Sequence, residues 1–351
     1  MKLYYPKSHY DKNARGSVFP LLKPFIKGVG FTDEQRVAMY GVSKVDFDFV
    51  EDLEEAELAI LTMSWNYYTY SDQMEKAMDF IELCASRNMN VLSWNAGDHG
   101  VKVPKLNNLI VLRESGYRSK FSSNEYTLPS FINDPLQKYY NTATPCLIPY
   151  SLKPRVGFCG QAHYSKKAAA LQLGQVFLRN LKYQLGQSWE EPEAFVSTIY
   201  LRAAVLKNLQ ESPGVETNFI LRQKYRAGVS DDKSKHQTTL EFYDNLKESP
   251  YILCIRGAGN FSVRFYEALA MGRIPVLVNT DCSLPLQGDI DWKKHLVWVE
   301  YKDRYKVGDI LKNFHVNLSE YDFLELQIRN RKLWEEKLGY GGFFRNFVSN
   351  M

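Results

Sequence analysis

The stretch ESPYILCIRGAGNFSVRFYEALAMGRIPVLVNTDCSLPLQGDIDW, which runs from Glu248 to Trp292, decides the fold. Its apolar runs predict a strand at Tyr251–Ile255 and another at Ile274–Val278, with a glycine-containing loop and a helix from Ser262 to Met271 between them. A strand, a helix and a second apolar strand form the repeating unit of a parallel sheet that is covered by helices. The stretch therefore predicts an α/β domain.

The same alternation of short apolar runs and amphipathic segments continues along the chain. Further strands are expected in the first half at Lys2–Tyr5, Leu58–Met63, Val91–Trp94 and Leu109–Leu112, and in the second half at Arg155–Gly160, Phe219–Leu221 and Leu296–Glu300. The predicted fold class is α/β, with two Rossmann-like doubly wound domains. The proline-rich stretch TPCLIPYSLKP separates them, which gives domains at 1–150 and 151–325. A helical tail at 326–351 is expected to pack back on the first domain.

Composition sets limits on the class of protein. The chain has 351 residues, 45% of them hydrophobic, which suits two cores better than one. The net charge of +4 is modest and its cations are dispersed, so a nucleic-acid partner is not expected, whereas an anionic ligand or membrane surface is compatible with it. The five cysteines are widely spaced without a CxxC pair, so neither a disulfide framework nor a zinc site is expected. No signal peptide or membrane-spanning run of about 20 residues is recognisable. A cytoplasmic protein is expected.

The loop Arg256-Gly257-Ala258-Gly259-Asn260 and the helix after it have the features of an anion site. Two close glycines allow a ligand to approach the backbone, and Ser262 can act as the N-cap of the helix. Free N–H groups at the helix start favour an anion, and the guanidinium groups of Arg256 and Arg264 match phosphate oxygens. Glu267, one turn further on, can accept hydrogen bonds from ribose hydroxyls. Taken singly, Arg264 reads as a surface ion pair and Glu267 as part of a solvated helix face.

Taken together, these residues resemble a known family. The residues Cys254, Arg256, Gly257, Gly259, Ser262, Arg264, Glu267, Ala268, Leu269, Gly272, Ile274, Pro275 and Val276, followed by Leu284-Pro285 and Asp291-Trp292, are similar to the C-terminal signature of the exostosin glycosyltransferases. The helix expected at Thr238–Ser249 also matches what precedes the family's strand. A fainter similarity lies upstream, at Trp94-Asn95-Ala96-Gly97-Asp98-His99.

The resemblance implies the GT-B architecture, in which two Rossmann-like domains face each other across a cleft. It further implies an inverting transfer of sugar from a nucleotide-sugar donor to a saccharide acceptor, with neither a cofactor nor a DxD-bound metal. Asp46-Phe47-Asp48 does form a DxD, but it reads as a polar turn. The absence of an anchor or a second catalytic domain suggests a bacterial-type member that builds surface polysaccharide, such as capsule, O-antigen or lipopolysaccharide. A lipid-linked acceptor and a peripheral position at the inner face of the membrane are compatible with that role.

Inverting transfer requires a general base and stabilisation of the leaving diphosphate. Arg222 follows an expected strand and so joins Arg256 and Arg264 at the carboxyl edge of the second sheet. For the base, Asp98 is the first candidate and His99 the second, because both follow the strand at Val91–Trp94. His9, after the first strand, is the third.

Several alternatives stay open at this stage. Trp65, Tyr67 and Trp94 could form an acceptor platform but more often such residues pack in a core, and Lys166 with Lys167 could meet phosphates or simply lie in solvent. Other activities with the same architecture are a nucleotide-sugar epimerase, which would act on the donor alone, and a phosphorylase. A catalytically silent sugar-binding subunit would bind donor without turnover.

Overall fold

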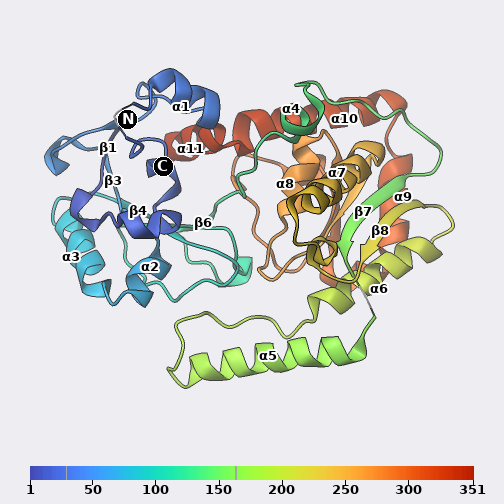
Figure 1. Cartoon of the computed structure of the whole chain (residues 1–351), viewed down its shortest axis with the longest axis horizontal. Helices are drawn as coiled ribbons and strands as arrows, with labels where there is room; N and C mark the ends of the chain where they lie inside the picture. The colour runs from blue at the N-terminus through green and yellow to red at the C-terminus, as the bar shows by residue number, and fades with distance from the viewer. Residues whose placement is uncertain (29, 163) are drawn as a thin grey trace.

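The computed structural model of the chain describes residues 1–28, 30–162 and 164–351 (Figure 1). Two parallel sheets form the centres of two α/β domains that lie side by side. The N-terminal domain has the strand order β2-β1-β3-β4-β5-β6, and every pairing is parallel. Its strands are β1 (Lys2–Tyr4), β2 (Asp48–Phe49), β3 (Leu58–Ile60), β4 (Val91–Asn95), β5 (Leu109–Arg113) and β6 (Glu125–Thr127). All five residues of β4 are buried, as expected for a central strand that is covered on both faces.

Within its described residues, the first domain has three α-helices between its strands and a fourth after the last strand. They are α1 (Asp33–Tyr40), α2 (Trp65–Tyr70) and α3 (Met74–Ala85), and α4 (Pro135–Tyr140) follows the last strand. A capping box begins α1, where Thr32 accepts from Gln35 N and the Gln35 side chain accepts from Thr32 N. Although α4 precedes the expected boundary at residue 150, Leu136 packs in the core of the second domain.

The C-terminal domain has a second parallel sheet, in the order β11-β10-β9-β7-β8. Its strands are β7 (Arg155–Gln161), β8 (Glu216–Arg222), β9 (Tyr251–Cys254), β10 (Ile274–Asn279) and β11 (Val297–Glu300). Its helices are α5 (Lys166–Gln184), α6 (Thr198–Glu211), α7 (Asp232–Glu248), α8 (Val263–Ala270), α9 (Val307–Val316) and α10 (Glu320–Leu333). Strands β9 and β10 are almost wholly buried, and their apolar side chains join two clusters on opposite faces of the sheet.

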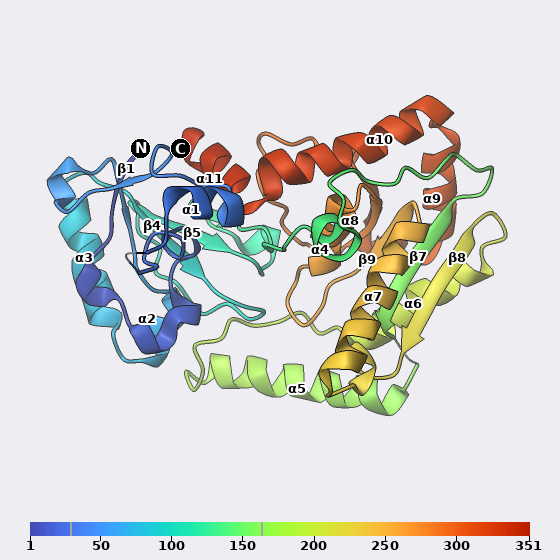
Figure 2. The same ribbon diagram turned by 45° about the horizontal axis from the view of Figure 1, so that its top comes forward.

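The end of the chain returns to the first domain, as expected. Helix α10 passes from the second domain toward the first, and a π-helical turn at Trp334–Leu338 leads into α11 (Tyr340–Ser349) (Figures 1 and 2). The aromatic rings of Phe343 and Phe344 are completely buried in the core of the N-terminal domain. Two Rossmann-like domains joined by such a return helix constitute the GT-B arrangement, so the predicted fold is confirmed.

All strands expected from the sequence are present, although the edge strands β2 and β6 and the helices α1, α2, α4, α6 and α9 were not predicted. No helix in the described part of the chain combines the length and apolar character that crossing a bilayer requires.

Candidate functional site

Four arginines gather over the carboxyl ends of neighbouring strands in the C-terminal sheet. Arg222 ends β8, Arg256 follows β9, Arg264 lies in the first turn of α8, and Arg202 comes from α6. Backbone carbonyls hold two of these guanidinium groups in place. Arg264 Nη2 donates to Cys159 O at 2.8 Å, and Arg202 Nη2 donates to Arg256 O at 2.8 Å. We call these four residues the arginine edge.

The guanidinium groups of the arginine edge lie close enough for their positive charges to repel one another. Burial lowers the pKa of Arg202 to about 10, and the charges of Arg264 and Arg256 add to the effect. Burial likewise lowers the pKa of Arg264. Within the described residues, the buried Nε atoms of all four arginines lack a hydrogen-bond partner. The Nε atom of Arg304, outside this edge, is in the same state, so the clustering of the cations and not the Nε atoms is what suits an anion with several oxygens.

Glu267 lies on α8 at the same edge. The Tyr243 hydroxyl of α7 donates to Glu267 Oε1 at 3.1 Å, which fixes the carboxylate on the inner side of the helix. Burial, and then the Glu267 charge, raises the pKa of Tyr243, so the phenol stays protonated and remains a donor. The side chain of Arg222 is held by α7 as well, because its Nη2 donates to Thr238 O at 2.8 Å and to Glu241 Oε2 at 2.7 Å.

The loop between β9 and α8 contacts the N-terminal domain. A Cβ atom at Gly259 would lie 2.7 Å from the Phe261 ring of the same loop and 2.9 Å from Asp98 O of the other domain, so both contacts favour a glycine there. A Cβ at Gly257 would meet nothing closer than 3.8 Å, and neither glycine has a positive φ. The prediction that both glycines make room for a ligand is therefore corrected for Gly259.

Asn260 is also occupied by the contact between the domains. Its backbone N–H donates to Ser115 Oγ at 2.9 Å, and its side-chain amide donates to Gly116 O, Thr280 O and Asp281 O. Its Oδ1 accepts from Thr280 Oγ1 at 2.7 Å, and the residue is only 1% exposed. The expected donor-binding role of Asn260 is thus replaced by a structural one, in which the residue joins the two domains.

Ser262 occupies the N-cap position of α8, as predicted, with extended backbone geometry. Its side chain makes no capping hydrogen bond. The first N–H groups of α8 therefore have no side-chain partner from Ser262.

The facing edge of the N-terminal sheet carries carboxylates beside the guanidinium group of Arg113, which ends β5 and is paired with Glu125 and Glu191. Asp98 follows β4 and is exposed, and Glu114 follows β5 and is half-buried. Burial, and then the negative charge of Asp98, raises the pKa of Glu114, while Lys23 and the Gly97 N–H act in the opposite direction. Glu114 also raises the pKa of Tyr266 on α8, after the larger effect of burial, so this carboxylate lies next to the second domain. We call Asp98 and Glu114 the carboxylate pair.

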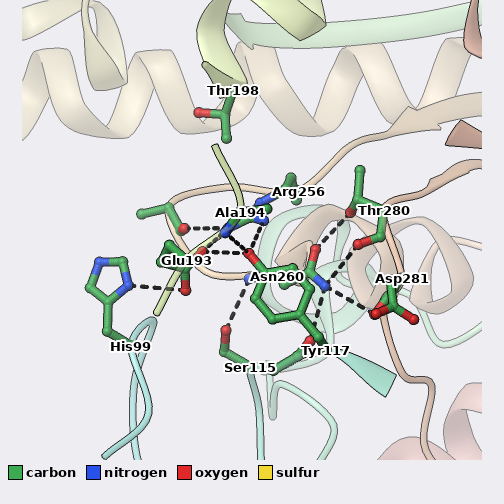
Figure 3. Close-up of polar contacts among 12 residues, drawn as sticks. His99, Ser115, Tyr117, Glu193, Ala194, Thr198, Arg256, Asn260, Thr280 and Asp281 are labelled. Atoms are coloured by element: carbon green, nitrogen blue, oxygen red, sulfur yellow. Dashed lines mark hydrogen bonds and ion pairs between the residues drawn. The ribbon is translucent and has the colours of Figure 1, made fainter. Parts of the chain in front are cut away.

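Glu193, in the segment after α5, links the two edges (Figure 3). Arg256 Nη2 donates to Glu193 Oε2 at 2.6 Å, and the Tyr117 hydroxyl donates to the same oxygen at 2.7 Å. Arg256 Nη1 in turn donates to the Tyr117 hydroxyl at 2.8 Å. Burial raises the pKa of Glu193, but hydrogen bonds from His99, Arg256 and Tyr117 and the Arg256 charge outweigh it, and the pKa falls to about 2.

His99 belongs to this link as well. Its Nδ1 lies 3.4 Å from Glu193 Oε1 and 3.2 Å from Arg179 Nη1 of α5. One tautomer of the imidazole donates to Glu193, and the other accepts from Arg179. His99 therefore faces Glu193 (Figure 3) and also meets Arg179 of α5, whereas Asp98 acts on Glu114 through its charge.

His9 does not join Asp98 and His99. It is buried among α2 and α3, with Nδ1 2.9 Å from the Tyr68 hydroxyl and its ring edge-on to Phe80. Burial, and then Lys76, lowers the pKa of His9 to about 4. The expectation that His9 faces the cleft as a base is corrected, because its ring is part of the packing of the N-terminal domain.

Other candidates from the sequence have structural surroundings. Trp65 and Trp94 are buried in the N-terminal core, and the Tyr67 hydroxyl donates to Asp11 Oδ2 at 3.0 Å. Asp46 of the DxD accepts from Ser43 N at 2.8 Å, as in a polar turn. Within residues 1–28, 30–162 and 164–351, no cluster of three or more His, Cys, Asp or Glu side chains is arranged to hold a metal ion.

Sequence reasoning missed Arg202, Glu114, Tyr117 and Glu193. Arg202 lies inside a helix that was not predicted, and Glu193 lies in a connection without periodicity. Glu114 could have been found from the sequence. It lies two residues after the expected strand Leu109–Leu112, at a carboxyl end where open α/β sheets bind ligands.

Comparison with known proteins agrees with the motif. Residues 198–314 match the Exostosin GT47 domain family. The chain is 30% identical over 128 residues to the probable beta-1,4-xylosyltransferase IRX10L of Arabidopsis thaliana, a match that covers 36% of this chain and 26% of that protein. It is 29% identical over 109 residues to Exostosin-1 of Drosophila melanogaster, which covers 31% of this chain and 14% of that protein. The resemblance stated from the motif is therefore confirmed over the C-terminal domain, although the chain spans less than a third of the length of these relatives.

Two solved structures are also similar. A glycosyltransferase from Rickettsia africae ESF-5 has a TM-score of 0.40 at 10% identity, with 99% of this chain and 97% of that chain covered. A mutant of S. aureus TarM, in complex with Fondaparinux, alpha-GlcNAc-glycerol and UDP, has a TM-score of 0.38 at 8% identity, with 83% and 54% covered.

Proposed function

We propose that the chain is an inverting glycosyltransferase that moves a sugar from a nucleotide-sugar donor to the hydroxyl group of a saccharide acceptor. The proposal rests on one observation above all. Guanidinium groups gather at the carboxyl edge of one sheet, Asp98 and Glu114 follow strands at the carboxyl edge of the other, and the loops of the two edges touch at Gly259 and Asn260. The first edge suits an anionic leaving group, and the second suits the removal of a proton.

The arginine edge would bind the donor diphosphate. Arg202, Arg222 and Arg264 offer guanidinium donors at the ends of β7, β8 and β9, and the amides at the start of α8 add partial positive charge. Bound phosphate oxygens would raise the lowered pKa values of Arg202 and Arg264 again, because a nearby negative charge favours the protonated guanidinium. Glu267, held by Tyr243, would accept hydrogen bonds from the ribose hydroxyls.

The transfer step needs the acceptor hydroxyl to lose its proton as it attacks. In the proposed reaction the acceptor oxygen bonds to the anomeric carbon on the face opposite the diphosphate. The carbon–oxygen bond to the diphosphate breaks, its electron pair stays on the phosphate oxygen, and the configuration at the anomeric carbon inverts. The proton passes to the carboxylate pair. A base is most effective when its pKa is close to the working pH, and the pKa of Glu114 is raised in that direction.

No resident cofactor or metal is proposed for this reaction. Several cations of the arginine edge can neutralise the charge that develops on the diphosphate, which is the task that a divalent cation performs in metal-dependent transferases.

The acceptor is proposed to be a growing surface polysaccharide, free or linked to a lipid, such as a precursor of capsule, O-antigen or lipopolysaccharide. The location proposed for the enzyme is the cytoplasm, at the inner face of the membrane.

Donor binding tests the proposal directly. A panel of nucleoside diphosphates and nucleotide-sugars is titrated into the protein by calorimetry, and we expect one nucleotide to bind with its affinity reduced about ten- to hundredfold in Arg264→Met, because charge-assisted hydrogen bonds contribute about 1.5–3 kcal/mol. Arg304→Met, a half-buried arginine stacked on Tyr301 outside this edge, is the control and should bind like the unmodified chain. Equal affinity in Arg264→Met would refute the phosphate role. Turnover of the donor without an acceptor would point instead to an epimerase.

A further inference from the structure

Helix α5 (Lys166–Gln184) lies along one side of the molecule, outside both sheets (Figures 1 and 2). The Ser165 side chain caps its first turn by accepting from Ala168 N at 3.1 Å. Of its 19 residues only Val176 is buried, so the helix packs on the protein along a narrow strip.

The apolar face of α5 points away from the protein. Leu171 is 71% exposed, Phe177 57% and Leu178 56%, and Leu181 and Leu185 are exposed as well. These residues recur at spacings of three, four and seven, which places them on one face of a helix. Large apolar side chains normally line the buried face of a surface helix, so this orientation is inverted. We call Leu171, Phe177, Leu178, Leu181 and Leu185 the outer strip.

Three polar side chains of α5, those of Gln172, Arg179 and Asn180, face the protein beside the buried Val176. Gln172 Oε1 accepts from Ser197 Oγ at 2.7 Å, Arg179 Nε lies 3.2 Å from Glu190 Oε2, and the Asn180 side chain bonds to both backbone groups of Glu193. These hydrogen bonds fix the rotation of the helix. The outer strip is therefore held outward by the polar contacts of the opposite face.

The charge of α5 is of one sign. Lys166, Lys167, Arg179 and Lys182 are its charged residues, and its sequence contains neither Asp nor Glu. The three lysines are exposed, and Arg179 faces the protein. An exposed apolar strip flanked by lysines matches a lipid surface with anionic headgroups, where the apolar side chains enter the acyl boundary and the cations meet phosphate.

We propose that α5 docks this protein on anionic membranes, with the outer strip inserted at the interface and Lys166, Lys167 and Lys182 on the headgroups. A lipid surface suits this face because it offers both an acyl boundary for the exposed apolar strip and anionic headgroups for the three exposed lysines. The same helix holds Glu193 through Asn180, and Glu193 bonds Arg256. Docking would therefore place the candidate site next to the membrane, where lipid-linked saccharides are found.

Vesicle sedimentation tests this inference on the full chain. Vesicles of phosphatidylglycerol and phosphatidylcholine are compared with vesicles of phosphatidylcholine alone. We expect binding to the anionic vesicles that weakens as salt is raised, and at least about a tenfold loss of binding in the triple variant Leu171→Ser, Phe177→Ser and Leu178→Ser. The control Leu152→Ser changes a leucine that is 91% exposed elsewhere and should bind normally.

Two results would overturn the inference. One is a lack of binding to anionic vesicles by the unmodified chain, and the other is equal binding by the triple variant. If light scattering finds a dimer that the triple variant abolishes, α5 is a contact between copies and not a lipid surface. Circular dichroism checks that the variants fold. Nucleotide calorimetry on the same variants separates this inference from the proposed reaction, since donor affinity should be unchanged in them.

Discussion

The two sheet edges that face each other have the same architecture and opposite chemistry. In both domains the strands are parallel, and the loops after β4 and β5 meet the loop after β9. The C-terminal edge collects Arg202, Arg222, Arg256 and Arg264, whereas the N-terminal edge has Asp98 and Glu114. Arg113 also lies at the N-terminal edge, but its guanidinium group is already paired with Glu125 and Glu191. In the proposed function, the same backbone geometry would serve anion binding on one side and proton removal on the other, and the side chains would decide the difference.

A third region, the link between the two edges, consists of residues that are already bonded to one another. Glu193, Arg256 and Tyr117 are bonded to one another between the domains, and Asn260 joins loops of both domains. Arg256 thus belongs to both regions, because its Nη atoms serve the link while its Nε lies at the arginine edge. The comparison implies that substitutions at the two edges affect catalysis, whereas substitutions at the link affect how firmly the domains are held together.

The largest effect is expected at Glu114. Glu114→Gln removes the proposed proton acceptor while keeping the size of the side chain. We expect kcat to fall about 10²- to 10⁴-fold, the usual contribution of a general base, with donor affinity unchanged. Steady-state kinetics and nucleotide calorimetry on the same preparation measure the two quantities. A normal kcat would remove Glu114 from the reaction and leave Asp98 as the base.

The link is tested by Glu193→Gln. The substitution leaves the buried Arg256 cation without its anion, so we expect the free energy of unfolding to fall by about 3 kcal/mol at neutral pH. Chemical denaturation measures this quantity, with the exposed Glu211→Gln on α6 as the control.

The pH dependence of that stability has a definite sign. The pKa of Glu193 lies at about 2 in the folded protein, against an ordinary value of 4.5. Its contribution is therefore present above pH 4.5 and is lost as the pH falls toward 2. The difference between the unmodified chain and Glu193→Gln should shrink over that range, and a difference that stays constant down to pH 2 would contradict the ion pair.

A smaller effect is expected for Asp98→Asn. The Asp98 charge helps to raise the pKa of Glu114, so its removal should lower that pKa. Activity depends on the deprotonated carboxylate and falls as the pH drops through this pKa. The acidic limb of kcat against pH should therefore move to lower pH in Asp98→Asn, with only a severalfold change in kcat near neutrality. A complete loss of activity with Glu114→Gln active would exchange the two roles.

The two edges also differ in how well the sequence predicted them. The arginine edge could be predicted because Arg256, Arg264 and Glu267 lie within one strand, loop and helix, and local patterns place such residues together. Arg202 could not, since it reaches the edge from α6 through a tertiary contact with the Arg256 carbonyl.

The link between the domains was harder to predict for the same reason. Asn260 bonds residues about 20 and 145 positions away, and Glu193 meets Tyr117 and His99 across the domain boundary. Such pairings depend on how two folded domains dock, which no short window of sequence contains. Gly259 illustrates the point in part, because a Cβ there would meet Asp98 O of the other domain as well as the neighbouring Phe261 ring, while its φ is not positive.

The smallest effect is expected at Ser262, and it separates a cap from a ligand contact. An N-cap serine normally stabilises a helix by about 1 kcal/mol through its side chain, but the Ser262 hydroxyl makes no such bond here. Ser262→Ala should therefore change the free energy of unfolding by less than about 0.5 kcal/mol. If the hydroxyl binds the donor phosphate, the affinity for nucleotide should still fall severalfold in the same variant. Ser165→Ala, at a cap that does bond to Ala168 N, provides the contrast, because there stability should fall while nucleotide affinity stays the same. A loss of stability at Ser262 equal to that at Ser165 would mean that the hydroxyl caps α8 after all.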